Sequence, residues 1–195
     1  MNSDMAIEIF GVASGLLYLY LEIKQRVWLW PVGFITSAVY IYVYLTAKFY
    51  ADMGLQVYYL AISLYGWYHW RHGGPNQQRD ELPVSRTPAQ LWPWLIGITA
   101  TLFVGLWQLL DRCTDSPVPI GDALTTALSI TATWMLSRKF IEHWGLWVLA
   151  NAMSMGLYIY KGLYPTAVLF AFYTAMPVVG YRQWLRTMHP APHNT

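Results

Sequence analysis

The sequence predicts an all-α membrane protein with seven transmembrane helices, arranged as two three-helix repeats joined by a single helix. Of the 195 residues, 56% are hydrophobic and only 11% are charged, well below the roughly one-quarter charged residues of soluble domains. The charged residues also cluster, which leaves apolar stretches near the roughly 20 residues that cross a bilayer. The predicted helices are 5–23, 28–46, 53–70, 91–110, 119–137, 144–160 and 164–184.

Two parts of the chain have similar sequences, which is the second reason for this fold. Coincidence is an alternative, because aromatic residues make up 17% of the chain. The ordered spacing favours a duplication, which is typical of membrane transporters. A shorter loop in the second copy would absorb the change in spacing along the chain. The matches are Gly66 with Gly180 and Trp70 with Trp184 at a spacing of 114, Tyr40-Ile41-Tyr42 with Tyr158-Ile159-Tyr160 at 118, and Trp30 with Trp147 at 117.

The odd number of helices determines how the two copies would be oriented. The first three and the last three helices would cross the membrane in the same directions, with segment 91–110 connecting them. The repeats would therefore be parallel, as in the sugar-transporting SWEET proteins. The predicted divisions are a first repeat (1–72), a cytosolic loop with the connecting helix (73–113), and a second repeat with a short cytosolic tail (114–195).

The basic residues predict that the N-terminus is outside and the C-terminus is cytosolic. In this orientation nine of the twelve Lys and Arg residues lie on the inner side, as the positive-inside rule requires. The first helix follows Asp4 rather than a basic cluster, so we expect it to be retained instead of cleaved as a signal peptide. The inner residues are Lys24, Arg26, Arg71, Arg79, Arg86, Arg138, Lys139, Arg182 and Arg186.

Several classes of function lack their sequence signature. The single cysteine, Cys113, cannot form an internal disulfide or a metal cluster. The chain has no phosphate-binding Gly-rich loop and no metalloprotease motif, no basic run suited to nucleic acid, and no feature that indicates a cofactor. An intramembrane enzyme using Asp122 or Glu22 with His143 is an alternative. However, Asp122 and His143 are predicted on opposite sides of the membrane, whereas acid–base catalysis needs hydrogen-bond reach.

Polar residues inside the apolar segments are candidates for binding a solute. Asp122, Thr126, Ser129 and Thr133 are spaced by four, three and four residues, which places them on one face of a helix. Polar groups facing lipid are costly, so they should point into the bundle. Hydrogen bonds between helices are an alternative explanation, above all for Ser and Thr. The polar candidates are Asn151, Gln56, Thr36, Ser154, Ser129 and Thr133.

The aromatic residues complete the predicted site, which we place near the middle of the membrane between the two repeats. Eleven Trp and fifteen Tyr exceed what interfacial belts need, and aromatic faces stack on flat rings and attract cations. A phosphate would need Lys or Arg in the middle of the membrane, and none is predicted there. The pattern therefore favours a flat, cationic, hydrogen-bonding solute that moves without ion coupling. The aromatic candidates are Tyr40, Tyr158, Tyr173, Trp30 and Trp147.

The chain resembles the PnuC family of bacterial vitamin transporters over nearly its whole length. The similar stretches are Trp30-Pro31-Val32-Gly33, Tyr50-Ala51-Asp52-Met53-Gly54-Leu55-Gln56, Tyr65-Gly66-Trp67-Tyr68-His69-Trp70, Ser137-Arg138-Lys139-Phe140-Ile141-Glu142-His143-Trp144 with Trp147 and Asn151, and Gly180-Tyr181-Arg182-Gln183-Trp184. The resemblance implies a SWEET-like 3+1+3 arrangement, a homotrimer in the bacterial inner membrane, and facilitated diffusion of an unphosphorylated vitamin. A cytosolic kinase would then trap the substrate by phosphorylation.

The resemblance leaves the substrate open between members of one chemical class. Family members carry nicotinamide riboside, thiamine or riboflavin, and the first two have a cationic ring that suits the predicted aromatic site. Transporters of nicotinamide riboside carry an asparagine where this chain has Thr36, although Asn151 matches their second asparagine. We therefore expect nicotinamide riboside first, with thiamine as the alternative.

Overall fold

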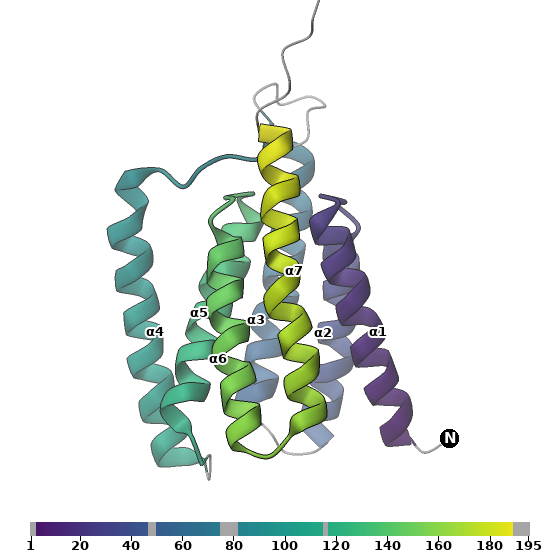
Figure 1. Ribbon diagram of the computed structural model, residues 1–195, viewed down its shortest axis with the longest axis vertical. Coiled ribbons are helices and arrows are strands. Elements are labelled where there is room, and N and C mark those ends of the chain that lie inside the picture. The colour runs from purple at the N-terminus through teal and green to yellow at the C-terminus, as the bar shows by residue number, and fades with distance from the viewer. Residues whose placement is uncertain (1–2, 47–49, 75–81, 115–116, 189–195) are drawn as a thin grey trace, which may run out of the picture. The chain divides into compact units, whose positions relative to one another are not determined.

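The computed structural model describes residues 3–46, 50–74, 82–114 and 117–188. Within these ranges the chain forms seven α-helices and one short 3-10 helix (Figure 1). All seven predicted segments are helices, with ends within four residues of the prediction. Arg79, which was assigned to the cytosolic loop, lies outside the described residues. The elements are α1 (Ser3–Ile23), α2 (Leu29–Thr46), α3 (Tyr50–His72), η1 (Ala89–Leu91), α4 (Trp92–Cys113), α5 (Pro119–Ser137), α6 (His143–Tyr160) and α7 (Tyr164–Met188).

The helices have the length and the surface of a multi-pass membrane protein. They contain 18 to 25 residues, and about 17–25 are needed to cross a bilayer. Among the described residues, two segments pass a combined test of length and hydropathy, Leu29–Thr46 and Ala89–Cys113. Large apolar side chains are nevertheless exposed throughout, for example 72% of Val168 and 70% of Trp94. Extensive exposed apolar surface is rare in water-soluble monomers and is expected where lipid is the solvent.

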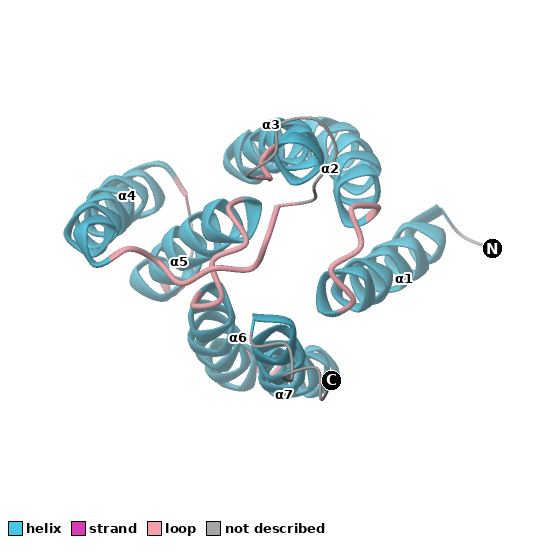
Figure 2. Ribbon diagram, turned by 90° about the horizontal axis from the view of Figure 1, so that it is seen from above, coloured by secondary structure: helices cyan, strands magenta, loops and turns pink. Residues whose placement is uncertain are grey.

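The chain divides into two compact units, which we describe separately. The first comprises Met1–Pro83 with Ser137–Lys139 and holds α1 to α3, and the second comprises Val84–Leu136 with Phe140–Thr195 and holds η1 and α4 to α7. Within the first unit α2 packs along α3. Within the second unit α4 lies beside α5, and α6 lies beside α7 (Figures 1 and 2).

The turns that follow α1 and α5 have the same backbone geometry at a spacing of 114 residues. Gln25, after α1, has a φ of 53°, and Lys139, after α5, has a φ of 52°. The N–H of Arg26 donates to the C=O of Leu21 at 2.8 Å, and the N–H of Phe140 donates to the C=O of Met135 at 3.0 Å. The same positive-φ reversal therefore ends α1 and α5.

The spacing of 114 also holds through the following helices, which corrects the sequence alignment. Leu29 and His143 begin α2 and α6, and Tyr50 and Tyr164 begin α3 and α7. Because the loops between these helices have equal length, the predicted change of spacing to 117 and 118 is wrong. The counterpart of Trp30 is Trp144 rather than Trp147, and Tyr40-Ile41-Tyr42 does not correspond to Tyr158-Ile159-Tyr160.

Each unit contains a pair of perpendicular tryptophans that pack over a glycine. Trp30 and Trp70 meet edge to face with ring centroids 5.5 Å apart, and Trp144 and Trp184 do so at 5.6 Å, both at 88°. All four side chains are at most 1% exposed. A Cβ at Gly66 would overlap the Trp30 ring, and the second unit has the same arrangement of Gly180 against Trp144. The tryptophans and glycines that recur between the copies therefore pack the helices of each unit together.

Candidate functional site

Four of the predicted polar and aromatic residues of the second unit lie on one face of α6. Trp147, Asn151, Ser154 and Tyr158 follow one another at spacings of four, three and four residues, so they lie along one side of the helix. Each of them is half-buried. The indole Nε1 of Trp147 is buried and has no hydrogen-bond partner among the described residues. An N–H donor of this kind is costly to bury unpaired, which makes it a candidate for bonding to a solute.

Asn151 is held by a defect in the neighbouring helix. Pro177 lies inside α7 and is buried, and proline has no N–H to donate to the carbonyl four residues earlier. That carbonyl belongs to Tyr173, and the Nδ2–H of Asn151 donates to it at 2.9 Å. Because a carbonyl can only accept, this bond fixes which end of the amide is nitrogen. The Oδ1 atom and the second N–H of Asn151 have no hydrogen-bond partner among the described residues and can bind a ligand.

An aromatic cluster lies next to this amide, on α6 and α7. The ring of Phe170 lies 4.9 Å from the ring of Tyr158, and 5.8 Å from the ring of Tyr173 at 90°. Tyr158 and Tyr173 were predicted, whereas Phe170 was not, although it lies one turn before Tyr173 on the same helix. Such a cluster offers ring faces and edges to a flat cation.

Three of the four hydroxyl candidates are bonded within their own helices. Ser129 Oγ donates to the C=O of Thr125 at 2.8 Å, and Thr133 Oγ1 donates to the C=O of Ser129 at 2.8 Å. Thr36 Oγ1 donates to the C=O of Val32 at 2.8 Å in the same manner. These bonds use the single O–H proton and leave the oxygen able to accept a further bond. The alternative of hydrogen bonds between helices therefore does not account for these three hydroxyls.

The first unit holds the remaining predicted site residues. Gln56 is half-buried on α3, and no hydrogen bond of its side chain is found among the described residues. The ring of Tyr40 lies 5.7 Å from that of Tyr44, and its hydroxyl occupies the space where a Cβ at Gly11 would be. Trp30 is fully buried against Trp70, so helix packing accounts for its position.

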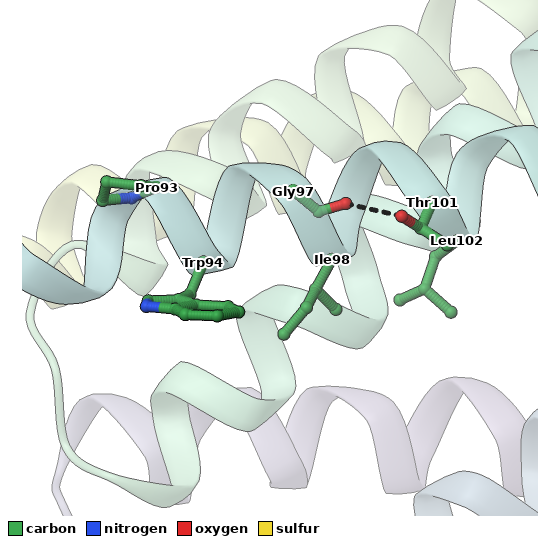
Figure 3. A pocket seen from close by; sticks show the side chains of 6 residues that line it. All are labelled: Pro93, Trp94, Gly97, Ile98, Thr101 and Leu102. Atoms are coloured by element: carbon green, nitrogen blue, oxygen red, sulfur yellow. Dashed lines mark hydrogen bonds between the residues drawn. The ribbon is translucent and has the colours of Figure 1, made fainter.

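Two apolar hollows in the second unit lie away from these residues. One is on the surface of α4, lined by Pro93, Trp94, Gly97, Ile98, Thr101 and Leu102 (Figure 3). Thr101 Oγ1 donates to the C=O of Gly97 at 2.9 Å (Figure 3), so its hydroxyl proton is used within α4. The other hollow lies against α4, α5 and α6, where Thr99 and Thr131 share a 2.7 Å hydroxyl contact among apolar side chains. Both hollows are lined almost entirely by apolar side chains, which suit a hydrogen-bonding solute poorly.

Asp122 and His143, two of the residues considered for intramembrane catalysis, each have another partner. Asp122 lies in the first turn of α5 and its carboxylate is 3.4 Å from Lys161 Nζ. His143 is fully buried at the other end of α5, where its Nδ1 contacts the C=O of Phe140 at 2.6 Å and its ring packs on Trp144. At about 1.5 Å per residue, most of the length of α5 separates the two groups. They do not form an acid–base pair.

Comparisons with known proteins agree on a family of membrane transporters. A family model described as nicotinamide mononucleotide transporter matches residues 5–186. The nicotinamide riboside transporter PnuC of Escherichia coli is 26% identical to the chain, over 93% of this chain and 85% of its own length. The riboflavin/roseoflavin transporter RibM of Streptomyces davaonensis is also 26% identical, over 93% of this chain and 84% of its own length. A crystal structure of the vitamin B3 transporter PnuC has the same fold, with a TM-score of 0.73 at 21% identity over 96% of this chain and 83% of that one.

Proposed function

We propose that this chain, which belongs to the nicotinamide mononucleotide transporter family, carries nicotinamide riboside across the bacterial inner membrane by facilitated diffusion. The observation that carries the proposal is the oriented amide of Asn151 beside the rings of Tyr158, Phe170 and Tyr173. The nicotinamide ring of the riboside is flat, carries a positive charge because its ring nitrogen is bonded to ribose, and bears a carboxamide. Its N–H groups suit the free Oδ1 of Asn151, and its C=O suits the unpaired N–H of Trp147.

The riboside suits these helices better than its phosphorylated form does. A phosphate needs Arg or Lys nearby, and no basic residue occurs between His143 and Tyr160 or between Tyr164 and Tyr181. Facilitated diffusion follows from the same composition, because the middle of these helices also lacks a carboxylate suited to ion coupling. Net uptake would then depend on a cytosolic kinase that phosphorylates the arriving substrate.

Riboflavin and thiamine are the competing substrates. Riboflavin is a candidate because the riboflavin/roseoflavin transporter and the nicotinamide riboside transporter are equally identical to this chain. Its ring system is uncharged, so it gains less from the electron-rich aromatic faces than a pyridinium does. Thiamine is cationic but lacks a carboxamide for Asn151 and Trp147.

We also propose a SWEET-like 3+1+3 arrangement of parallel repeats, with the N-terminus outside. The constant spacing of 114 residues, the matched reversals at Gln25 and Lys139, and the matched tryptophan pairs support a duplicated three-helix unit. The proposed divisions are 1–72, 73–113 with α4 as the connector, and 114–195, and the proposed assembly is a homotrimer.

The polar residues do not recur between the copies, which supports a binding role for them. At the spacing of 114, Asn151 corresponds to Ser37, and Gln56 corresponds to Phe170. Packing residues are kept in both copies, whereas nothing requires a residue that binds a solute to recur. Gln56, Thr36 and Tyr40 are therefore retained as candidate ligand-binding residues of the first unit.

Calorimetry on the purified protein tests the substrate. Nicotinamide riboside should bind most tightly among the riboside, its mononucleotide, thiamine and riboflavin. Tighter binding of thiamine or riboflavin would overturn the assignment. In proteoliposomes the riboside should equilibrate across the membrane without accumulating, and accumulation driven by an imposed ion gradient would contradict facilitated diffusion.

A further inference from the structure

A loose ion pair lies at the end of the second unit where α5 begins and α6 ends. Lys161 Nζ lies 3.4 Å from Asp122 Oδ1, and the two side chains are 25% and 33% exposed. Strong charge-assisted bonds are shorter, about 2.7–2.9 Å, and exposed ion pairs stabilise proteins little. The ammonium is therefore held weakly enough to exchange with another cation.

Neighbouring residues of α6 and α7 lead from this ion pair to Asn151. Tyr158 lies one turn before Lys161 on α6. Its ring contacts Phe170, the Phe170 ring contacts Tyr173, and the C=O of Tyr173 accepts the bond from Asn151. Charged, aromatic and amide groups thus follow one another from the helix end into the unit.

We propose that Asp122 recruits the cationic ring of the substrate, and that Lys161 is the competing cation that the ring displaces. This inference rests on the proposed function, because it requires a substrate that carries a positive charge. Replacement of an ammonium by a pyridinium leaves the carboxylate paired throughout, so no unpaired charge is created. The aromatic rings of Tyr158 and Phe170 then receive the cation from the carboxylate.

A structural role for the same pair makes different predictions. A carboxylate in the first turn of α5 and an ammonium at the end of α6 both complement the helix dipoles, so the pair would join two helix ends. In that case loss of either partner should lower stability and impair every substrate equally. In the recruiting role the two partners have opposite effects, and only a charged substrate responds to them.

The test compares initial uptake into proteoliposomes at substrate concentrations well below saturation. The substrates are nicotinamide riboside and its reduced 1,4-dihydro form, which has a similar shape and an uncharged ring. The variants are Asp122→Asn and Lys161→Gln. The control is Asp111→Asn, because Asp111 is an exposed carboxylate in the last turn of α4, the helix that precedes α5.

We expect Asp122→Asn to slow uptake of the cation about fivefold, the factor for one unit charge about 4 Å away in water. Lys161→Gln should speed it, since the ammonium that competes for the carboxylate is removed. Neither variant should change uptake of the dihydro form, and Asp111→Asn should change neither substrate. If the Asp122→Asn variant does not fold, the Lys161→Gln variant tests the proposal by itself, through the direction in which its uptake rate of the cation changes.

Three results would overturn the inference. They are equal losses for both substrates in both variants, a Lys161→Gln variant that is no faster than the parent, and an Asp111→Asn variant that matches Asp122→Asn. Failure of the proposed function is distinguishable, because the parent protein would then not take up nicotinamide riboside at all.

Discussion

The side-chain amide of Asn151 donates to the main-chain carbonyl of Tyr173, which Pro177 leaves without its helical partner. In the first unit the carbonyl at the corresponding position, that of Tyr59, accepts from the hydroxyl of Ser63 at 2.7 Å. Ser63 lies 114 residues before Pro177 and still has its N–H. The two units have therefore diverged at this carbonyl, and the second one requires an amide from another helix. Asn151 combines this structural role with the ligand-binding role proposed for it.

Asn151→Leu separates the two roles when it is combined with Pro177→Ala. Alone, Asn151→Leu should lower the free energy of unfolding by about 1–3 kcal/mol, because the Tyr173 carbonyl is left unpaired. It should also weaken binding of nicotinamide riboside about tenfold or more, from the lost bond to the ligand. In the Pro177→Ala background the new N–H can bond to that carbonyl, so the same change should cost less stability.

Thermal unfolding and calorimetry of the four proteins in this double-mutant cycle measure both effects. The binding loss should persist in the double variant, since Pro177→Ala restores no group that faces the ligand. Recovery of binding together with stability would show that Asn151 acts only on the packing of α7.

Gly66→Ala and Gly180→Ala should destabilise the protein to a similar extent. Each new Cβ would overlap the ring of a buried tryptophan, Trp30 or Trp144, and overpacking typically costs about 1–3 kcal/mol. Gly105→Ala is the matched control, because it lies inside α4 with nothing within 4 Å of the new Cβ. Melting temperatures measure the three effects. Tolerance of both substitutions would contradict the matched tryptophan packing.

Helix positions could be predicted from the sequence because charge and apolar length determine them directly. The register of the repeat could not, since the matches of Trp30 with Trp147 and of the two Tyr-Ile-Tyr runs came from side chains alone. The register follows from the turns, where Gln25 and Lys139 adopt positive φ. Neither is glycine or asparagine, which are the residues that usually mark that conformation.

The candidate site could be predicted in part. A face of α6 with Trp147, Asn151, Ser154 and Tyr158 follows from helical spacing, and the structure confirms that these residues lie on one helix. The contact of Phe170 with Tyr158 depends on how α6 and α7 pack, which spacing within one helix does not determine. The hydrogen bond of Asn151 could have been found from the sequence, because a proline inside an apolar segment indicates a carbonyl without its helical partner.

Thr36→Asn should strengthen binding of nicotinamide riboside relative to thiamine. Thr36 Oγ1 donates its hydrogen bond to the C=O of Val32. An asparagine amide would present both a donor and an acceptor to a carboxamide. Calorimetry with both vitamins measures the change in preference. An unchanged ratio would exclude position 36 from the determinants of specificity.

The native cysteine tests the proposed topology. Cys113 is exposed at the end of α4, on the outer side if the N-terminus is outside. A membrane-impermeant maleimide should therefore label it in intact cells, and a cysteine replacing Asn194 in a Cys113→Ser background should be labelled only after permeabilisation. The reverse pattern would require the opposite orientation.

Trp147→Phe distinguishes a ligand-binding indole from a packing one. The Nε1 of Trp147 and that of Trp144 are both buried without a partner among the described residues, and the two residues lie three positions apart on α6. Phenylalanine keeps a ring and removes an unpaired donor. Neither substitution therefore breaks a hydrogen bond within the protein, and neither should lower the free energy of unfolding for that reason. Trp147→Phe should nevertheless weaken riboside binding about tenfold, for a lost bond to a buried ligand group. Trp144→Phe should leave binding unchanged, since its ring packs edge to face on Trp184. Equal binding by the parent and the Trp147→Phe variant in calorimetry would remove Trp147 from the site.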